Sequence, residues 1–284
     1  MGRLTVPNNT PQHPVNHVYA GYWDRTQWPL QGLYFLLPLL ILYELGTLML
    51  APEGDQRLPQ IVAESLLDKG FQWFGGTGFH LPAIIAVVVL FCLHLVRRDP
   101  WAPEPKLYGV MWLESFGWAL PLFIFQMVLV REMAGSVEAL QSLSNTAAVA
   151  DPWKENMIFS IGAGIYEELL FRLIGIALLH MLFVDVLALP EKYGGAAAIG
   201  VSALAFAMYH FIRVTPDAMV GFTVEHFDWG RFAFFTLAGV YLALIYVIRG
   251  FGVVVGTHAL YDVLIVWTNF GLTGKLMAWL GMNS

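Results

Sequence analysis

The amino-acid sequence predicts an all-α fold, a polytopic bundle of about seven or eight transmembrane helices. The chain of 284 residues is 57% hydrophobic and only 13% charged, with a mean hydropathy of +0.62. That is more apolar than a soluble protein of this length can bury. Apolar stretches of roughly 20 residues, enough to cross ~30 Å of hydrocarbon, recur along the chain. They lie at 30–50, 79–96, 109–130, 157–187, 196–213, 231–249 and 253–270.

The polar connections divide the chain into a segment at 1–27 and a single transmembrane domain at 28–284. The first segment lacks the apolar core of a signal peptide, so we expect the first helix itself to insert the chain. Between the first two spans, apolar residues among charges predict either an amphipathic surface helix or a packed loop. The other long connection is 132–155, and we expect its polar Ser-Leu-Ser-Asn-Thr portion, 142–146, to form an exposed loop. The stretch Leu272 to Leu280 is too short to cross a membrane alone.

Charge and cysteine content limit the partners and the topology. The formal net charge of -6 comes without a block of basic residues, which argues against a nucleic-acid partner. The single cysteine, Cys92, excludes an intrachain disulfide. The densest basic loop contains Arg97, Arg98 and Lys106. The positive-inside rule places this loop, and therefore the N-terminus, in the cytoplasm of a multi-pass integral membrane protein.

Three charged residues interrupt one apolar helix: Glu167, Glu168 and Arg172. Each costs about 2.5–3.5 kcal/mol on membrane-insertion scales, so such groups usually face a protein interior and carry function. Residues four apart stack on one helix face, so Glu168 can pair with Arg172. Glu167 points elsewhere and is our candidate general base. Alternatively, all three residues form an ion network that only locks helices together.

Two later apolar helices each carry a histidine, His210 and His258. His258 and Asp262 are four residues apart, so the carboxylate can orient the imidazole or bind the same water. A lone buried histidine is more often an interhelical contact than a reactive group. Ionisable residues on three helices together favour a functional site.

Other polar residues in the apolar stretches have a structural explanation. We expect them to form interhelical hydrogen bonds rather than to take part in chemistry. They are Glu44, His94, Glu114, Gln126 and His180. Gly252 and Gly256 do not follow a strand, so we expect them to permit close helix packing rather than to bind a nucleotide.

The three motifs resemble those of the CPBP family, which includes the type II CAAX prenyl proteases and bacterial Abi proteins. Glu167-Glu168-Leu-Leu-Phe-Arg172, Phe206-Ala-Met-Tyr-His210 and His258-Ala-Leu-Tyr-Asp262 match the family's motifs in order, within a core at 157–270. The resemblance implies a bacterial or archaeal membrane protein. It further implies an endopeptidase that cuts a membrane-associated or lipid-modified protein or peptide near its terminus.

In that resemblance Glu167 and His210 activate a water, His258 helps to bind the oxyanion, and Glu168 and Arg172 support them. Asp262 stands where the prenyl proteases usually have asparagine. An ionised carboxylate only accepts hydrogen bonds, so we expect it to orient His258 or a water instead.

The resemblance implies neither a metal nor another cofactor. A metal site remains an alternative, because one glutamate and two histidines can supply three ligands. A noncatalytic immunity or scaffold protein of the same family is the second alternative. A proton-coupled transporter is the third, although the sequence lacks repeated halves.

Overall fold

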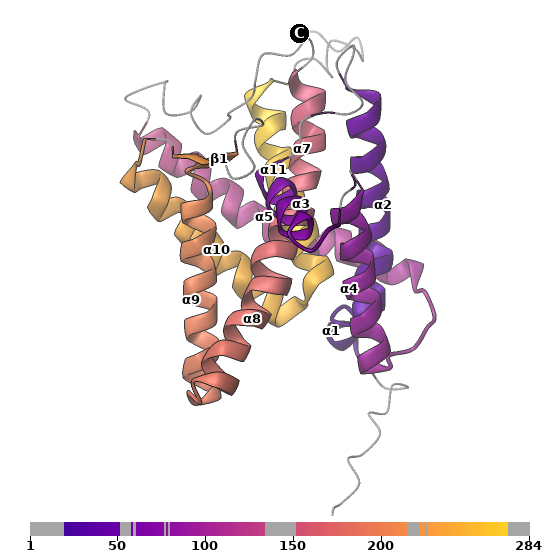
Figure 1. The fold of residues 1–284 in the computed structure, drawn as a ribbon. Coiled ribbons are helices and arrows are strands. Elements are labelled where there is room, and N and C mark those ends of the chain that lie inside the picture. The colour runs from indigo at the N-terminus through magenta and orange to yellow at the C-terminus, as the bar shows by residue number, and fades with distance from the viewer. Residues whose placement is uncertain are drawn as a thin grey trace, which may run out of the picture.

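The computed structural model describes residues 20–51, 58, 61–76, 78, 80–133, 152–214, 222–224 and 226–271. These residues form a bundle of helices with one short β-hairpin (Figure 1). The elements are α1 (Tyr22–Arg25), α2 (Pro29–Met49), α3 (Val62–Gln72), α4 (Leu81–Arg97), α5 (Pro105–Met133), α7 (Pro152–Glu168), η2 (Leu169–Ile176), α8 (Ala177–His180), η3 (Met181–Val186), α9 (Glu191–Tyr209), β1 (Ile212–Val214), β2 (Phe222–Val224), α10 (Trp229–Arg249) and α11 (Phe251–Asn269).

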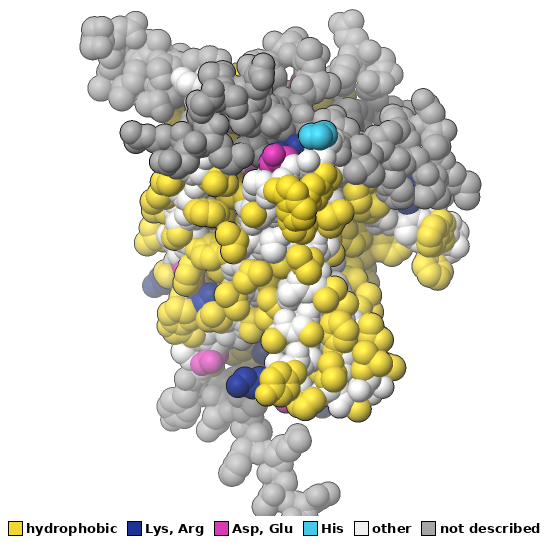
Figure 2. Space-filling view, turned by 90° about the vertical axis from the view of Figure 1, so that its left-hand side faces the viewer, with side chains coloured by type: hydrophobic (Ala, Val, Ile, Leu, Met, Phe, Trp, Pro, Cys, Tyr) yellow, Lys and Arg dark blue, Asp and Glu magenta, His cyan; other side chains and the backbone are white. Residues whose placement is uncertain are grey.

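Five helical segments of the described chain are long and apolar enough to cross a membrane. They are Pro29–Met49, Pro105–Leu129, Trp153–Val186, Trp229–Arg249 and Phe251–Asn269. Hydrophobic side chains cover most of the face shown in Figure 2, as a lipid-facing surface requires. The chain is therefore an integral membrane protein, and the predicted all-α polytopic bundle is confirmed.

Each of the seven predicted spans coincides with a helical segment in the described part of the chain, but two of these segments are not among the five that are long and apolar enough to cross a membrane. Helix α4 has only 17 residues, and α9 begins with the charged pair Glu191 and Lys192. The predicted span 196–213 also extends too far. The helix ends at Tyr209, and Ile212 begins strand β1, which pairs antiparallel with β2. The segment from Leu272 to Leu280 and the expected loop at 142–146 lie outside the described residues.

Helix α11 occupies the centre of the bundle, where it packs against α7, α5, α2 and α10. All its residues from Phe251 to Ala259 are buried. Close packing at its two glycines is confirmed. A side-chain carbon on Gly252 would lie 3.2 Å from the Cα of Gly32, and one on Gly256 would lie 2.6 Å from Ser115 Oγ. These glycines let α2 and α5 approach α11 closely.

The segment between the first two spans contains an amphipathic helix, α3, rather than a packed loop. It buries Ala63, Glu64 and Leu67, and packs against α7, α4 and β1. Glu64 is fully buried and accepts a hydrogen bond of 2.5 Å from the Tyr43 hydroxyl. The aromatic side chains that follow the helix, Trp73 and Phe74, are 73% and 89% exposed. Helix α3 thus covers the end of α7 that carries the charged residues.

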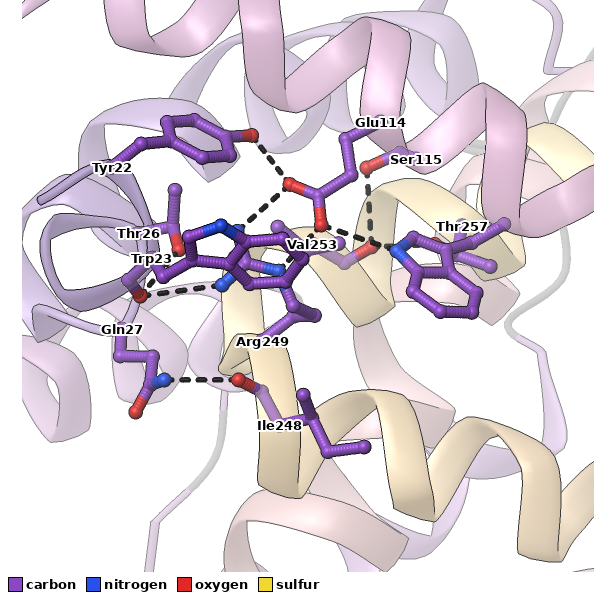
Figure 3. A network of polar contacts seen from close by, with 11 residues as sticks. Tyr22, Trp23, Thr26, Gln27, Glu114, Ser115, Ile248, Arg249, Val253 and Thr257 are labelled. Atoms are coloured by element: carbon purple, nitrogen blue, oxygen red, sulfur yellow. Dashed lines mark hydrogen bonds and ion pairs between the residues drawn. The ribbon is translucent and has the colours of Figure 1, made fainter.

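A buried ion pair fastens the N-terminal helix α1 to α5 and α10 (Figure 3). Arg249, which is fully buried, donates to Glu114 through Nε at 2.5 Å and through Nη2 at 2.9 Å. Its guanidinium also lies 3.7 Å from the centre of the Trp23 ring and donates to the Trp23 carbonyl. Tyr22 donates to the same carboxylate. Burial and the adjacent Glu114 raise the pKa of Tyr22, so its hydroxyl stays protonated.

The substitution Arg249→Lys is expected to lower the free energy of unfolding by about 2 kcal/mol. Lysine keeps the charge but cannot form the bidentate contact or stack its head group on Trp23. Unfolding in detergent should show the loss. Arg25→Lys is the matched control, because both side chains of its pair with Glu104 are about a third exposed and such surface pairs contribute little. Equal losses in the two variants would contradict this explanation.

Other buried polar residues were expected to form interhelical hydrogen bonds. The structure confirms this for Glu114, for Glu44, which accepts from Tyr166, and for Gln126, which accepts from Tyr261. The prediction is wrong for His94. Its ring nitrogens are buried without a hydrogen bond to any described residue, and its ring packs edge-on against Trp101 at 4.4 Å. The aromatic contact replaces the expected polar one.

Candidate active site

The six candidate site residues come from three parts of the chain that fold together. Glu167 and Glu168 end helix α7, and Arg172 lies in η2, a π-helical continuation of the same segment. Single π-helical turns are frequent at functional sites. The remaining three are His210, at the C-terminal end of α9, and His258 and Asp262, in α11.

Glu168 joins the cation on its own helix to the histidine on α11. One oxygen, Oε2, lies 3.1 Å from Arg172 Nε, so the pair predicted from the i, i+4 spacing is present. The other oxygen, Oε1, lies 2.7 Å from His258 Nδ1. Glu168 and Arg172 are both fully buried. Arg172 also lies 4.2 Å above the Phe206 ring. This carboxylate therefore neutralises one buried cation and fixes the orientation of an imidazole.

Glu167 points toward both histidines, away from Arg172. Its Oε1 accepts a hydrogen bond of 3.2 Å from the Tyr209 hydroxyl. Its Oε2 lies 3.8 Å from His258 Nε2 and 3.9 Å from His210 Nε2. These two distances are too long for hydrogen bonds. Oε2 is buried and has no hydrogen-bond partner among the described residues. The site thus brings one carboxylate oxygen and two imidazole nitrogens together with none of them bonded to another.

The contacts of His210 determine which of its nitrogens can act as a base. Its Nδ1 lies 2.8 Å from the Phe206 carbonyl oxygen. A carbonyl only accepts hydrogen bonds, so Nδ1 carries the proton in the neutral ring. Nε2 then has a free lone pair on the side of Glu167. The ring is held by stacking on Phe235, at 3.7 Å between centroids and 16° between planes.

Asp262 lies beside the His258 ring, as the spacing on α11 predicted. Its Oδ2 is 3.5 Å from Nε2, whereas Nδ1 is bonded to Glu168. Asp262 therefore faces the same nitrogen as Glu167 does. Its carboxylate can stabilise a proton on Nε2.

Two features of this site were missed in the sequence, although each left a signal. For the bond between Glu168 and His258, the signal was a buried carboxylate with two oxygens, which can take a second partner besides Arg172 but does not identify it. Tyr209 was quoted within a motif but given no role. A buried tyrosine usually needs a hydrogen-bond partner, and the partner here is Glu167.

The site is buried at Glu167 and His258 and partly exposed at His210 and Asp262, whose side chains are 20% and 27% exposed. Glu167 is 7% exposed, and His258 is 4% exposed. Two cavities of about 330 and 320 Å³ lie near the C-terminal end of α4, and neither is lined by any of the six candidate residues. Among the described residues, no group of three or more His, Cys, Asp or Glu side chains is arranged to hold a metal ion.

A comparison with protein families matches the part of the chain that carries the site. Residues 151–264 match the model described as type II CAAX prenyl endopeptidase, Rce1-like. This Rce1-like segment contains all six candidate residues, and the match is consistent with the resemblance to the CPBP family seen in the three motifs. Searches of curated proteins and of solved structures gave no match.

Proposed function

We propose that this chain is an intramembrane endopeptidase that uses a glutamate- and histidine-activated water. Its substrate would be a membrane-associated or lipid-modified protein or peptide, cleaved near its terminus. The observation that carries the proposal is the approach of Glu167 Oε2 to the Nε2 atoms of His210 and His258, at 3.9 and 3.8 Å. The Rce1-like segment, which matches the model of a CAAX-type protease family, supports the same reaction class.

The reaction needs a base, an acid and a donor for the oxyanion, and the site offers each of them. A water between Glu167 and His210 would give one proton to either group as its oxygen bonds to the peptide carbonyl carbon. The carbonyl π electrons would move onto the carbonyl oxygen. When the C–N bond breaks, the same proton would pass to the leaving nitrogen. No serine or cysteine nucleophile takes part.

His258 is the proposed donor to the oxyanion. Its Nδ1 is committed to Glu168, and Asp262 and Glu167 lie near Nε2. These carboxylates would favour a second proton on the ring, which would convert Nε2 into a donor. Because the ring is fixed by a fully buried carboxylate, the donor would need no reorientation as charge develops.

We also propose that the protein lies in a bacterial or archaeal cell membrane with its N-terminus in the cytoplasm. The loop between α4 and α5, which carries Arg97, Arg98 and Lys106, would then face the cytoplasm too. The bilayer would present the substrate to the protein. A topology reporter fused within this loop should report a cytoplasmic position, and an extracytoplasmic position would reverse the orientation.

Purified protein in liposomes, incubated with membrane-anchored peptides, should release fragments cut near one terminus, as measured by mass spectrometry. The alternatives give different results. Proton-dependent solute flux without fragments would indicate a transporter. Neither fragments nor flux across a broad peptide set would favour a noncatalytic scaffold. Elemental analysis of the same preparation tests the metal alternative, because stoichiometric zinc lost and regained together with activity would replace the water mechanism proposed here.

A further inference from the structure

Tyr209, the last residue of α9, holds the Glu167 carboxylate from a second helix. Its hydroxyl donates to Glu167 Oε1 at 3.2 Å. The Tyr209 ring is buried and packs edge-on against Phe171, with 5.2 Å between centroids. The hydroxyl is thus held beside the carboxylate by a ring that is itself packed.

This contact distinguishes the two oxygens of Glu167. Oε1 is bonded to Tyr209, whereas Oε2 faces the two Nε2 atoms without a hydrogen bond of its own. Without the Tyr209 hydroxyl, the carboxylate could rotate about its terminal torsion, which has broad minima. General-base catalysis requires the reacting oxygen to lie within hydrogen-bond reach of the proton that it takes.

We propose that Tyr209 is a positioning residue for the Glu167 carboxylate. The inference rests on the proposed function for its effect on rate. The contact itself is a property of the protein without substrate, and it can be measured separately.

The variant Tyr209→Phe removes the hydroxyl and keeps the ring that packs on Phe171. We expect kcat to fall about tenfold, which corresponds to the loss of one hydrogen bond to a charged group, with KM unchanged. The acidic limb of the pH–rate profile should move to higher pH, because a carboxylate that loses a donor is protonated more easily. A purely structural role would not move this limb. Tyr241→Phe is the matched control, since its hydroxyl bonds the Trp118 carbonyl away from the site.

Infrared titration tests the contact without any substrate. The carboxyl band that disappears in Glu167→Gln belongs to Glu167, and its midpoint should rise in Tyr209→Phe but not in Tyr241→Phe. If the wild type cleaves no peptide, the proposed function fails while this titration still decides the inference. A folded Tyr209→Phe protein with unchanged kcat, pH profile and infrared midpoint would overturn it.

Discussion

Replacing Glu168 with glutamine is expected to lower the free energy of unfolding by about 3–5 kcal/mol, the usual effect of breaking a buried ion pair on one side. Arg172 is fully buried, and its other close contacts are the Phe206 ring and the Gly239 carbonyl. The amide would leave its charge uncompensated. His258 would also lose the anionic partner of Nδ1. Denaturation of the purified protein in detergent would measure the loss.

Two further variants separate the ion pair from a general effect of removing a carboxylate. Glu104→Gln breaks a pair with Arg25 whose side chains are 30% and 34% exposed, so its effect should stay below about 1 kcal/mol. The double variant Glu168→Gln, Arg172→Gln removes both charges and should recover part of the lost stability. If Glu168→Gln were as stable as Glu104→Gln, Glu168 would not be the group that compensates Arg172.

The helices of this protein were predictable because the membrane imposes a minimum length and a uniform polarity on each span. The predicted window 253–270, for example, differs from α11 by two residues at the start and one at the end. The errors occur where another interaction competes with hydropathy. Ile212 is as apolar as the helix before it, yet it pairs with Val224 in a strand. No local pattern distinguishes these two outcomes in a short apolar run.

The attachment of α1 to the bundle could not be predicted for a different reason. Tyr22 and Trp23 lie in a polar stretch with no periodicity, and their partners, Glu114 and Arg249, are far away in sequence. Charges in apolar helices indicate that a partner exists. Their spacing does not identify the partner when it lies on another helix.

The same limit explains which site contacts the sequence predicted. The pair of Glu168 with Arg172 lies within one helical segment, so the i, i+4 rule was sufficient. The bond between Glu168 and His258 crosses from α7 to α11. It depends on the helix rotations and on the close packing of Gly164 against Ala259, which only the folded structure provides. The sequence therefore identified the candidate residues, whereas the partner of each imidazole required the structure.

The variant Glu167→Gln is expected to lower kcat by about 10²–10⁴-fold, the usual contribution of a general base. In contrast to Glu168→Gln, it should leave stability close to that of the wild type. The glutamine carbonyl can accept the hydrogen bond from Tyr209, and Oε2 has no hydrogen bond to lose. An amide cannot take the proton of the attacking water. Cleavage kinetics and denaturation of both variants would be measured on the same preparations.

Comparison of the two glutamates separates the loss of the base from a general disruption of the fold. Adjacent residues on one helix have the same membrane depth, and both are buried, so a loss of activity from general disruption should be similar in both variants. The different contacts predict separate effects: Glu167→Gln should be stable and inactive, whereas Glu168→Gln should be destabilised. Wild-type turnover by a folded Glu167→Gln protein would remove Glu167 as the base. His210, whose Nε2 has a free lone pair on the same side, would then be the group to test as the sole base.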